Sequence, residues 1–415
     1  MVLDDICVLI ADCPHSTAPD EGSGYPLIRT PNIGKARFLL DGVHRVSKQV
    51  YEQRNKRATP QDNDIIFARE APAGNAAIIK NGDKYCLGQR TVLIRPDPQK
   101  VNPDYLAYYL LAPEQQHKLL STAHGATVSH VNIPDIHNMN VDNLPSIENQ
   151  KQIANTLIAY DDLIENNQKL IKLLEEAAQR LYKEWFIDLR FPGHESTPIH
   201  DGLPEGWERK TIGDLISYEI GGGWGDEEPS NSADHGAFVI RGTDLYGLTH
   251  GSLMEIPFRY HGANNLTARA LEDGDIVFEV SGGSRTEGVA RTALIRENML
   301  ARWDSPVMCA SFCKLIRPIS PDYAQYLFDH FQYLRSSGKT EEYDKRSASS
   351  IVNYRWKDFL SQETMLEPSK QIIDLYNQNV APIYDAIVAK SLQIETARNA
   401  RDRLLPKLMS GEIEV

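Results

Sequence analysis

A cluster of basic side chains in the N-terminal part of the chain is the clearest candidate for binding chemistry. Six basic residues lie within fourteen positions, opposed only by Glu52, with tyrosine and amide side chains interleaved. Long cationic side chains fit phosphate oxygens, whereas amide and guanidinium groups match the edges of adenine and guanine in the DNA major groove. The cluster indicates nucleic-acid binding, although an ordinary solvated charged face would have the same composition. Its members are His44, Arg45, Lys48, Arg54, Lys56 and Arg57.

Motifs that could support catalysis lack the residues that the chemistry needs. Asn102-Pro103-Asp104-Tyr105 is similar to the tetrapeptide of amino-group DNA methyltransferases but departs from it at the third residue, and no glycine-rich cofactor loop accompanies it. Asn before Pro instead predicts a capped helix start. Residues 283–288 have the spacing of a phosphate-binding loop, yet Val289-Ala290 stands where Lys and Ser or Thr are required. The motifs therefore contain no complete catalytic constellation.

Histidine, cysteine and overall composition exclude further classes of site. The 12 histidines form no metal-ligand motif, and we expect no bound metal. Five cysteines are too few and too scattered for a disulfide framework, and Cys309 and Cys313 lie in an apolar run that predicts buried thiols. The formal net charge of −13 argues against nonspecific coating of nucleic acid, and no apolar run is long enough to span a membrane. We expect a cytoplasmic globular protein.

The two halves of the sequence are weakly similar to each other, with the matching segments in the same order. This similarity predicts that the secondary-structure elements that position the candidate residues occur twice. Six short matches recur in the same order, at an offset that drifts only between 211 and 222 residues. One of them aligns residues 62–67 with 273–278, and another aligns 93–96 with 315–318. Repeated order at nearly constant spacing is the sign of an internal duplication. Each half then has a globular region of short strands followed by a long helix.

Both predicted helices carry an apolar stripe with alternating steps of three and four, which is typical of a coiled coil. A single stripe of this kind would more often be the buried face of an ordinary surface helix. Residues 153–185, however, would form a rod of about 50 Å, too long for one small domain to cover, so we expect the two helices to pair. Pro382 and Pro406 predict a kink near residues 378–382 and fraying at the end. The residues expected to pair are Ile153, Leu157, Ile164, Asn167, Ile171, Leu174 and Leu181 in the first helix, and Ile383, Ile387, Lys390, Ile394 and Leu404 in the second.

The predicted fold class is α+β, with two tandem α/β domains, each followed by a long helix, and the two helices paired as a coiled coil. The expected boundaries place the first domain at residues 1–147, and the central helix at 148–190. A linker follows at 191–206, and then come the second domain at 207–366 and the C-terminal helix at 367–415.

Several strings resemble the specificity subunits of type I restriction-modification enzymes. These strings are Leu203-Pro204-Glu205-Gly206-Trp207 before Thr211-Ile212-Gly213-Asp214-Leu215, the segment from Gly125 to Pro134, Leu144-Pro145 with Glu148, Gln150 and Ile153, and the ending from Leu404 to Ile413. The first half lacks the Leu-Pro-x-Gly-Trp string, and the second replaces Pro-x-x-Glu-Gln with residues 367–371. The similarity covers essentially the whole chain.

The resemblance implies a DNA-recognition subunit whose two domains are target recognition domains that read the halves of an asymmetric, split target in double-stranded DNA. It also implies that the two long helices pair as an antiparallel coiled coil and form the spacer, and that the chain itself is not an enzyme and binds no cofactor. It also implies two modification subunits, which use S-adenosylmethionine to methylate adenine N6, and restriction (translocase) subunits, which use ATP with Mg²⁺. A rod of about 50 Å spans roughly 15 base pairs at 3.4 Å each, enough to separate two half-sites.

Candidate DNA contacts follow from the basic residues of both halves, and a DNA-free coiled-coil scaffold is the rival interpretation. The scaffold would explain the acidity and the helices but not the duplicated globular regions. The candidate DNA-binding residues are Arg45, Lys48, Arg54, Lys56, Arg57 and Arg69 in the first half, and Arg285, Arg291, Lys345 and Arg346 in the second.

Overall fold

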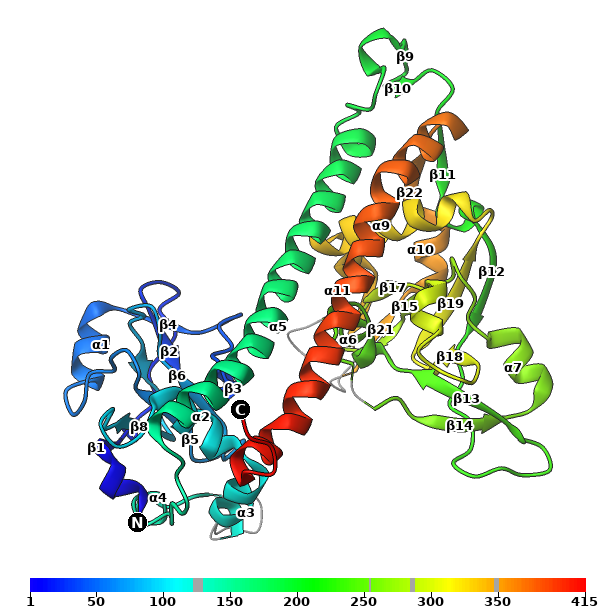
Figure 1. Ribbon diagram of the computed structural model, residues 1–415. Coiled ribbons are helices and arrows are strands. Elements are labelled where there is room, and N and C mark those ends of the chain that lie inside the picture. Colours follow the sequence, from blue (N-terminus) through cyan, green and yellow to red (C-terminus); the bar gives the residue numbers. More distant parts are fainter. Residues whose placement is uncertain (122–129, 254, 284–287, 347–350) are drawn as a thin grey trace. The chain divides into compact units, whose positions relative to one another are not determined.

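The computed structural model describes residues 1–121, 130–253, 255–283, 288–346 and 351–415 (Figure 1). Two compact units can be distinguished. Unit 1 comprises Met1–Asp162 and Arg398–Val415, and unit 2 comprises Leu163–Ala397. This division cuts both long helices, so each unit contains one recognition region together with parts of both helices. The five-segment division expected from the sequence follows the repeats instead and stays a prediction.

Unit 1 is built on a five-stranded sheet in the order β1-β8-β5-β6-β3 and a three-stranded sheet in the order β4-β2-β7. The strands are β1 (Cys7–Asp12), β2 (Tyr25–Ile28), β3 (Lys35–Ala36), β4 (Arg45–Val46), β5 (Ile65–Ala68), β6 (Ala76–Ile78), β7 (Cys86–Leu87) and β8 (Thr91–Pro96). The helices are α1 (Lys48–Arg54), α2 (Pro103–Leu111), α3 (Pro113–Ser121), α4 (Ile133–His137) and the first part of α5 (Ile147–Tyr182).

Unit 2 repeats this plan with larger additions. Its strands are β9 (Ile199–His200), β10 (Leu203–Pro204), β11 (Glu208–Thr211), β12 (Ile216–Gly221), β13 (His235–Ile240), β14 (Phe258–His261), β15 (Ile276–Glu279), β16 (Ser281–Gly282), β17 (Thr292–Leu294), β18 (Val307–Cys309), β19 (Cys313–Pro318), β20 (Asp344–Arg346), β21 (Val352–Tyr354) and β22 (Thr364–Glu367). Its helices are α6 (Leu245–His250), α7 (Ala263–Arg269), α8 (Glu297–Leu300), α9 (Asp322–Ser336), α10 (Trp356–Gln362) and most of α11 (Lys370–Ser410).

Strand order and register confirm the internal duplication. The order β12-β19-β15-β17 in unit 2 matches β1-β8-β5-β6 in unit 1, and both units have a parallel pair, β2 with β7 and β13 with β18. The central strands pair in the same register, with Ile65 opposite Ile94 and Ile276 opposite Ile316. The two repeats therefore share one backbone plan, although their sequences are only weakly similar to each other.

A buried ion pair recurs at the same place in both repeats. Arg95 donates to both carboxylate oxygens of Asp64 at 2.8 and 2.7 Å, and Arg317 donates to both oxygens of Asp275 at 2.8 Å. The two aspartates are almost fully buried, at 2% and 1% side-chain exposure. Bidentate, charge-assisted bonds of this kind tie two neighbouring strands together in each unit.

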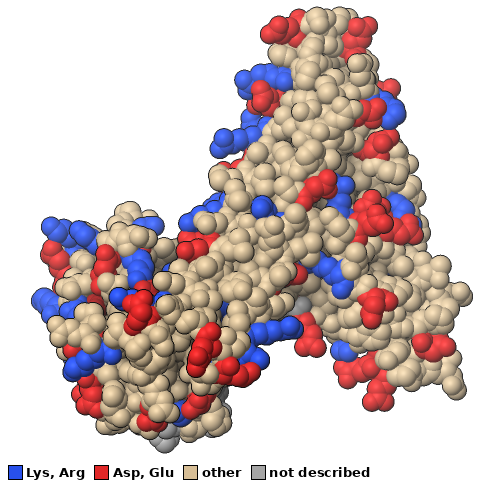
Figure 2. All heavy atoms as spheres, viewed as in Figure 1, with Lys and Arg blue, Asp and Glu red and all other residues tan. Residues whose placement is uncertain are grey.

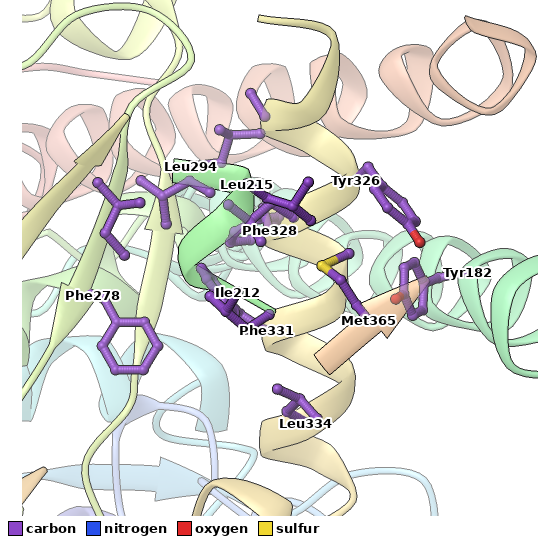
Figure 3. Packing of buried hydrophobic residues seen from close by; sticks show 14 of the residues in the cluster. Tyr182, Ile212, Leu215, Phe278, Leu294, Tyr326, Phe328, Phe331, Leu334 and Met365 are labelled. Carbon is purple, nitrogen blue, oxygen red and sulfur yellow. The ribbon is translucent and has the colours of Figure 1, made fainter. Parts of the chain in front are cut away.

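The main sheet of each unit separates two apolar cores. Along β15, Ile276 and Phe278 point into one core, and Val277 points into the other. Figure 3 shows the first of these cores, where Phe331 of α9 and Phe278 are labelled among the packed side chains. Burial on both faces explains the uninterrupted apolar runs of these strands, which do not alternate with polar residues.

Local signals at helix ends are confirmed in part. Asn102 Oδ1 accepts a 2.9 Å hydrogen bond from the Tyr105 N–H and caps α2, with Pro103 in its first turn. The expected fraying near Pro406 is wrong, because α11 is one continuous helix from Lys370 to Ser410, whereas a kink near Pro382 stays a prediction. A proline removes one backbone donor, and packing of the remaining residues outweighs that loss.

The two long helices lie side by side and antiparallel within each unit (Figure 1). In unit 1, Leu157 of α5 shares a core with Leu408 of α11. In unit 2, Tyr182 shares a core with Tyr376. Later residues of α5 thus pack against earlier residues of α11, which is the antiparallel pairing that was predicted.

Candidate DNA interface and spacer helices

The basic cluster of the first half forms α1 and its flanking residues. Ser47 caps the helix, and Tyr51 stacks on Tyr25 with ring centroids 4.2 Å apart. Four of the candidate residues are exposed to water, as a DNA contact requires: Arg45, Lys48, Lys56 and Arg57. Lys48 is within 3.7 Å of Glu52 on the same exposed face, a pair that contributes little to stability.

Arg54 faces the protein interior and does not belong to this exposed set. Its side chain is 7% exposed, and it donates to the carbonyl oxygens of Leu87 at 2.9 Å and Ser16 at 2.8 Å. The guanidinium group therefore joins α1 to β7 and to the N-terminal segment. The geometry corrects the expectation for Arg54, because its donors are engaged by backbone acceptors.

Arg69 is also an internal residue. It is 7% exposed, pairs with Asp12 at 3.0 Å and donates to the carbonyl of Val131 at 3.0 Å. Its second terminal nitrogen lies 2.9 Å from His130 Nε2. These contacts join the ends of β1 and β5 to the segment before α4, so the geometry supports a structural role.

The candidates in the second half fall into three groups. Arg285 lies outside the described residues. Arg291 pairs with the buried carboxylate of Glu279 through two bonds of 2.8 and 2.6 Å, which places it in the domain framework. Lys345 and Arg346 lie exposed on β20, and Arg346 pairs with Asp344 at 3.4 Å. DNA contact by the exposed candidates stays a prediction.

Charge on the visible surface is mixed. Figure 2 shows Lys and Arg side chains interspersed with Asp and Glu over both units, without a continuous basic band on this face. A mixed surface agrees with the net charge of −13 and favours local contacts over nonspecific coating of DNA. Sequence-dependent contacts must then supply much of the preference for one site.

The expected pairing stripe describes most of the contact between α5 and α11. Ile153, Leu157, Ile164, Asn167 and Ile171 are buried along α5, as are Ile387 and Ile394 along α11. The partly buried members are Leu174, Leu181, Ile383, Lys390 and Leu404. At the partly buried members Leu181, Lys390 and Leu404, the next residue along the helix is buried instead, namely Tyr182, Ser391 and Leu405. A straight α-helix has 3.6 residues per turn, so its contact face drifts relative to a 3.5-residue repeat.

Two polar contacts cross the paired helices. Arg401 forms an ion pair with Asp161, which also accepts a hydrogen bond from the hydroxyl of Tyr108 on α2. Asn167 Nδ2 donates to Gln393 Oε1 at 3.2 Å. The apolar stripe in the sequence did not indicate the pairing of Asp161 with Arg401, because the partners are 240 residues apart.

In unit 2 a buried carboxylate joins the recognition region to α11. Asp329 of α9 is fully buried and accepts hydrogen bonds from the hydroxyls of Tyr376, at 2.7 Å, and Tyr384. Burial raises the pKa of Asp329 to about 6, against the lowering effect of these donors. Burial lowers the pKa of the neighbouring His330 to about 3. Sequence periodicity did not indicate this polar cluster.

A second apolar stripe on α5 remains exposed. Leu163 and Leu170 are each 43% exposed and Leu173 is 60% exposed, so they lie away from the helix pairing. Their spacing of seven and three residues places them on one face. The same heptad analysis applied to the other face of the helix could have identified them.

The described part of the chain contains no cluster of three His, Cys, Asp or Glu side chains that could hold a metal ion. Cys309 and Cys313 are fully buried, and burial raises the pKa of Cys309 to about 12. Gly222 packs so closely that an added Cβ would lie 2.3 Å from the carbonyl oxygens of Cys309 and Ala310. This glycine-rich turn therefore serves close backbone packing. No described helix is long and apolar enough to cross a membrane.

Comparison with known proteins agrees with this architecture. The sequence model of the "Type I restriction modification DNA specificity domain" matches residues 1–176. The chain is 25% identical over 411 residues to the type I restriction enzyme MjaIX specificity subunit of Methanocaldococcus jannaschii, covering 95% of this chain and 88% of that protein. It is 21% identical to the HindI specificity subunit of Haemophilus influenzae, covering 94% and 95% of the two chains.

A solved structure shows the same fold. The type I restriction-modification S subunit from M. genitalium superposes with a TM-score of 0.56 at 13% identity, covering 98% of this chain and 95% of that one. The relatives are specificity subunits, which are not the catalytic components, in agreement with the expectation that this chain is not an enzyme. Along nearly its whole length the chain is therefore similar to specificity subunits of type I restriction enzymes, and its first 176 residues match the DNA specificity domain of type I restriction-modification systems.

Proposed function

We propose that the chain reads an asymmetric target of two separated half-sites in double-stranded DNA, one with each recognition region. The observation that carries this proposal is the duplication: both repeats keep the same strand order, register and buried Arg–Asp pair. Their exposed side chains differ, with basic residues on α1 in one repeat and on β20 in the other. Two similar frameworks with unlike surfaces would recognise two unlike sequences.

The paired helices act as the spacer between the half-sites. We infer that the chain works in the cytoplasm and directs adenine-N6 methylation by two modification subunits and DNA cleavage by restriction subunits. S-adenosylmethionine, and ATP with Mg²⁺, are then bound by those partners rather than by this chain. The exposed leucines of α5 suit a partner helix, because apolar side chains at this spacing form helix-to-helix contacts.

Methylation sequencing tests the recognition role. Cells that express this chain with its modification subunit should carry N6-methyladenine in both halves of one split motif, and the motif should disappear when this chain is deleted. Unchanged methylation with an intact complex would contradict the proposal and favour the DNA-free scaffold. The deletion strain complemented with the wild-type chain is the control.

Two aspartate substitutions on adjacent faces of α5 test the docking surface. Leu173→Asp changes a 60% exposed residue, so the chain should fold normally and lose binding to the modification subunit. Ile164→Asp places a charge at a position that is 8% exposed, and it should destabilise the helix pair itself. Normal affinity of the Leu173 variant for the modification subunit would exclude this stripe as the docking surface.

A further inference from the structure

An exposed row of side chains crosses the small sheet β16-β21-β20 of unit 2. Asn353 pairs with Ser281 on one side and with Lys345 on the other. Its neighbours Val352 and Tyr354 are buried, at 2% and 8% exposure, so the alternation of the strand leaves Asn353 on the outer face. The row thus presents an amide between a hydroxyl and an ammonium group.

The row continues onto the main sheet through Phe312. The Phe312 carbonyl accepts hydrogen bonds from the backbone of Val280 at 2.9 Å and Ser281 at 3.2 Å, and its ring is 55% exposed. An aromatic side chain this exposed, beside a polar row, gains nothing from the core. Its position on the turn before β19 makes it available to an external apolar group.

Ser281 orients the Asn353 amide. The Ser281 hydroxyl donates to Asn353 Oδ1 at 2.9 Å. Among the described residues no further hydrogen bond to this amide is formed, so the Nδ2 donors and the second lone pair of Oδ1 can meet a ligand. One donor beside one acceptor matches N7 and N6 of adenine in the major groove, and an apolar ring matches the methyl group of thymine.

The dimensions of the row suit the same groove. Neighbouring strands lie about 4.8 Å apart, so three steps from Phe312 to Lys345 cover about 14 Å. The major groove is about 12 Å wide and admits a two-stranded β-ribbon such as β20 and β21. Lys345, which pairs with Asn353 on the outer strand, would then face the phosphate backbone.

Unit 1 presents different chemistry at the corresponding place. Arg90 precedes β8 as Phe312 precedes β19, and Glu70 follows β5 as Ser281 follows β15. Arg90 pairs with Glu70 at 3.1 Å, and Glu70 pairs with His130 at 2.8 Å. The same edge of the repeated framework is therefore ionic in unit 1, and polar and aromatic in unit 2.

We propose that the row of Phe312, Ser281, Asn353 and Lys345 is the base-reading edge of unit 2, with Asn353 recognising an adenine. This inference rests on the proposed function and assigns one base contact within it. Phe312 contacts a thymine methyl group, and Lys345 contacts a phosphate. Ser281 is a positioning residue that acts through the Asn353 amide.

The test measures binding of the full chain, in complex with its modification subunits, to duplexes with each base pair of the target substituted singly. Asn353→Ala should reduce discrimination at one adenine of one half-site from about tenfold or a hundredfold to near none. Asn353→Asp should shift the preference at that position toward cytosine, because a carboxylate accepts from cytosine N4. Every position of the other half-site should be unchanged.

Three further variants separate base reading from general effects. Asn231→Ala removes another exposed asparagine of unit 2 and should leave discrimination unchanged. Ser281→Ala should lower discrimination at the same adenine as Asn353→Ala, by a smaller factor. Lys345→Ala should weaken binding to all duplexes evenly and reduce the salt slope by about one.

Two outcomes would overturn the inference in different ways. If the wild-type complex discriminates among sequences and Asn353→Ala and Asn353→Asp discriminate equally well, Asn353 does not read a base and only this inference fails. If the wild-type complex binds all duplexes alike, the proposed function fails as well. Even weakening of all duplexes by Asn353→Ala would make it a backbone contact and also contradict the inference.

Discussion

Removal of the Asp161 carboxylate tests how the paired helices hold unit 1 together. Asp161 is 3% exposed and forms an ion pair with Arg401, whose side chain is 9% exposed. It also accepts a hydrogen bond from Tyr108 of the recognition region. Asp161→Ala therefore leaves a buried guanidinium group without its main partner, although Asp402 remains 2.8 Å away.

The free energy of unfolding of unit 1 should fall strongly in Asp161→Ala, because the carboxylate is removed and the Arg401 guanidinium group stays buried. Deleting one partner of a buried ion pair typically lowers stability by about 3 to 5 kcal/mol. Every 1.4 kcal/mol changes an equilibrium constant tenfold, so opening of unit 1 should become more frequent by about two to three and a half orders of magnitude. Unit 2 lacks Asp161 and Arg401 and should change far less.

Hydrogen exchange with mass spectrometry can measure the two units separately. Peptides from α2 and from residues 398–410 report unit 1, whereas all five tryptophans lie in unit 2 and report its unfolding by fluorescence. Asp162→Ala is the matched control, because this neighbour is 55% exposed and pairs with Arg37 at 2.6 Å. An exposed pair should contribute less than about 1 kcal/mol.

Three results would refute this reasoning about the ion pair. A loss below about 1 kcal/mol in unit 1 would mean that Arg401 reaches water or Asp402 at little cost. An equal effect of Asp161→Ala and Asp162→Ala would mean that burial is irrelevant at this position. Faster exchange in unit 2 than in unit 1 would contradict the assignment of the contact to unit 1.

The remaining predictions concern the pH dependence, the repeated ion pair and the basic face of α1. Native Asp329 keeps its proton to a pKa of about 6, whereas an unfolded Asp keeps it to about 3.9, so the unfolding free energy of the wild type relative to Asp329→Asn should fall by about 2 kcal/mol as the pH rises from 4 to 7. Denaturation measured at a series of pH values checks this. His330 has the opposite pH dependence in both proteins, so its effect cancels in the comparison. Arg95→Ala and Arg317→Ala should each lower the unfolding free energy of their own unit by about 1.5 to 3 kcal/mol, measured by denaturant titration with a separate signal for each unit. Clearly different losses in the two units would contradict the structural equivalence of the two ion pairs. The double variant Lys56→Ala, Arg57→Ala should reduce the slope of log binding constant against log salt concentration by about 0.9 per lost phosphate contact. Arg54→Ala should mainly lower stability, because this side chain is buried. An unchanged slope in the double variant would exclude the exposed face of α1 as a DNA contact.

Features encoded over short distances were accessible from the sequence. The cap of Asn102, the buried thiols and the long helices depend on neighbouring residues or on one period, and the structure confirms them. The duplication was also visible, because both repeats must supply the same buried apolar runs to the same sheet. The resemblance to type I specificity subunits followed from short strings and from the order of these parts along the chain.

Only the tertiary structure decided which side chains face inward. The periodicity of α1 could not show that Arg54 meets the carbonyl of Leu87, since that acceptor is on a strand 33 residues away. The same holds for the pairing of Asp161 with Arg401 and for the alignment of Phe312, Ser281 and Asn353 in one row. Composition and spacing specify which residue types are present, whereas burial and partners depend on long-range packing. The sequence by itself therefore determined the repeated plan and the resemblance to type I specificity subunits, and tertiary packing decided which charged residues stabilise the fold and which remain exposed for binding.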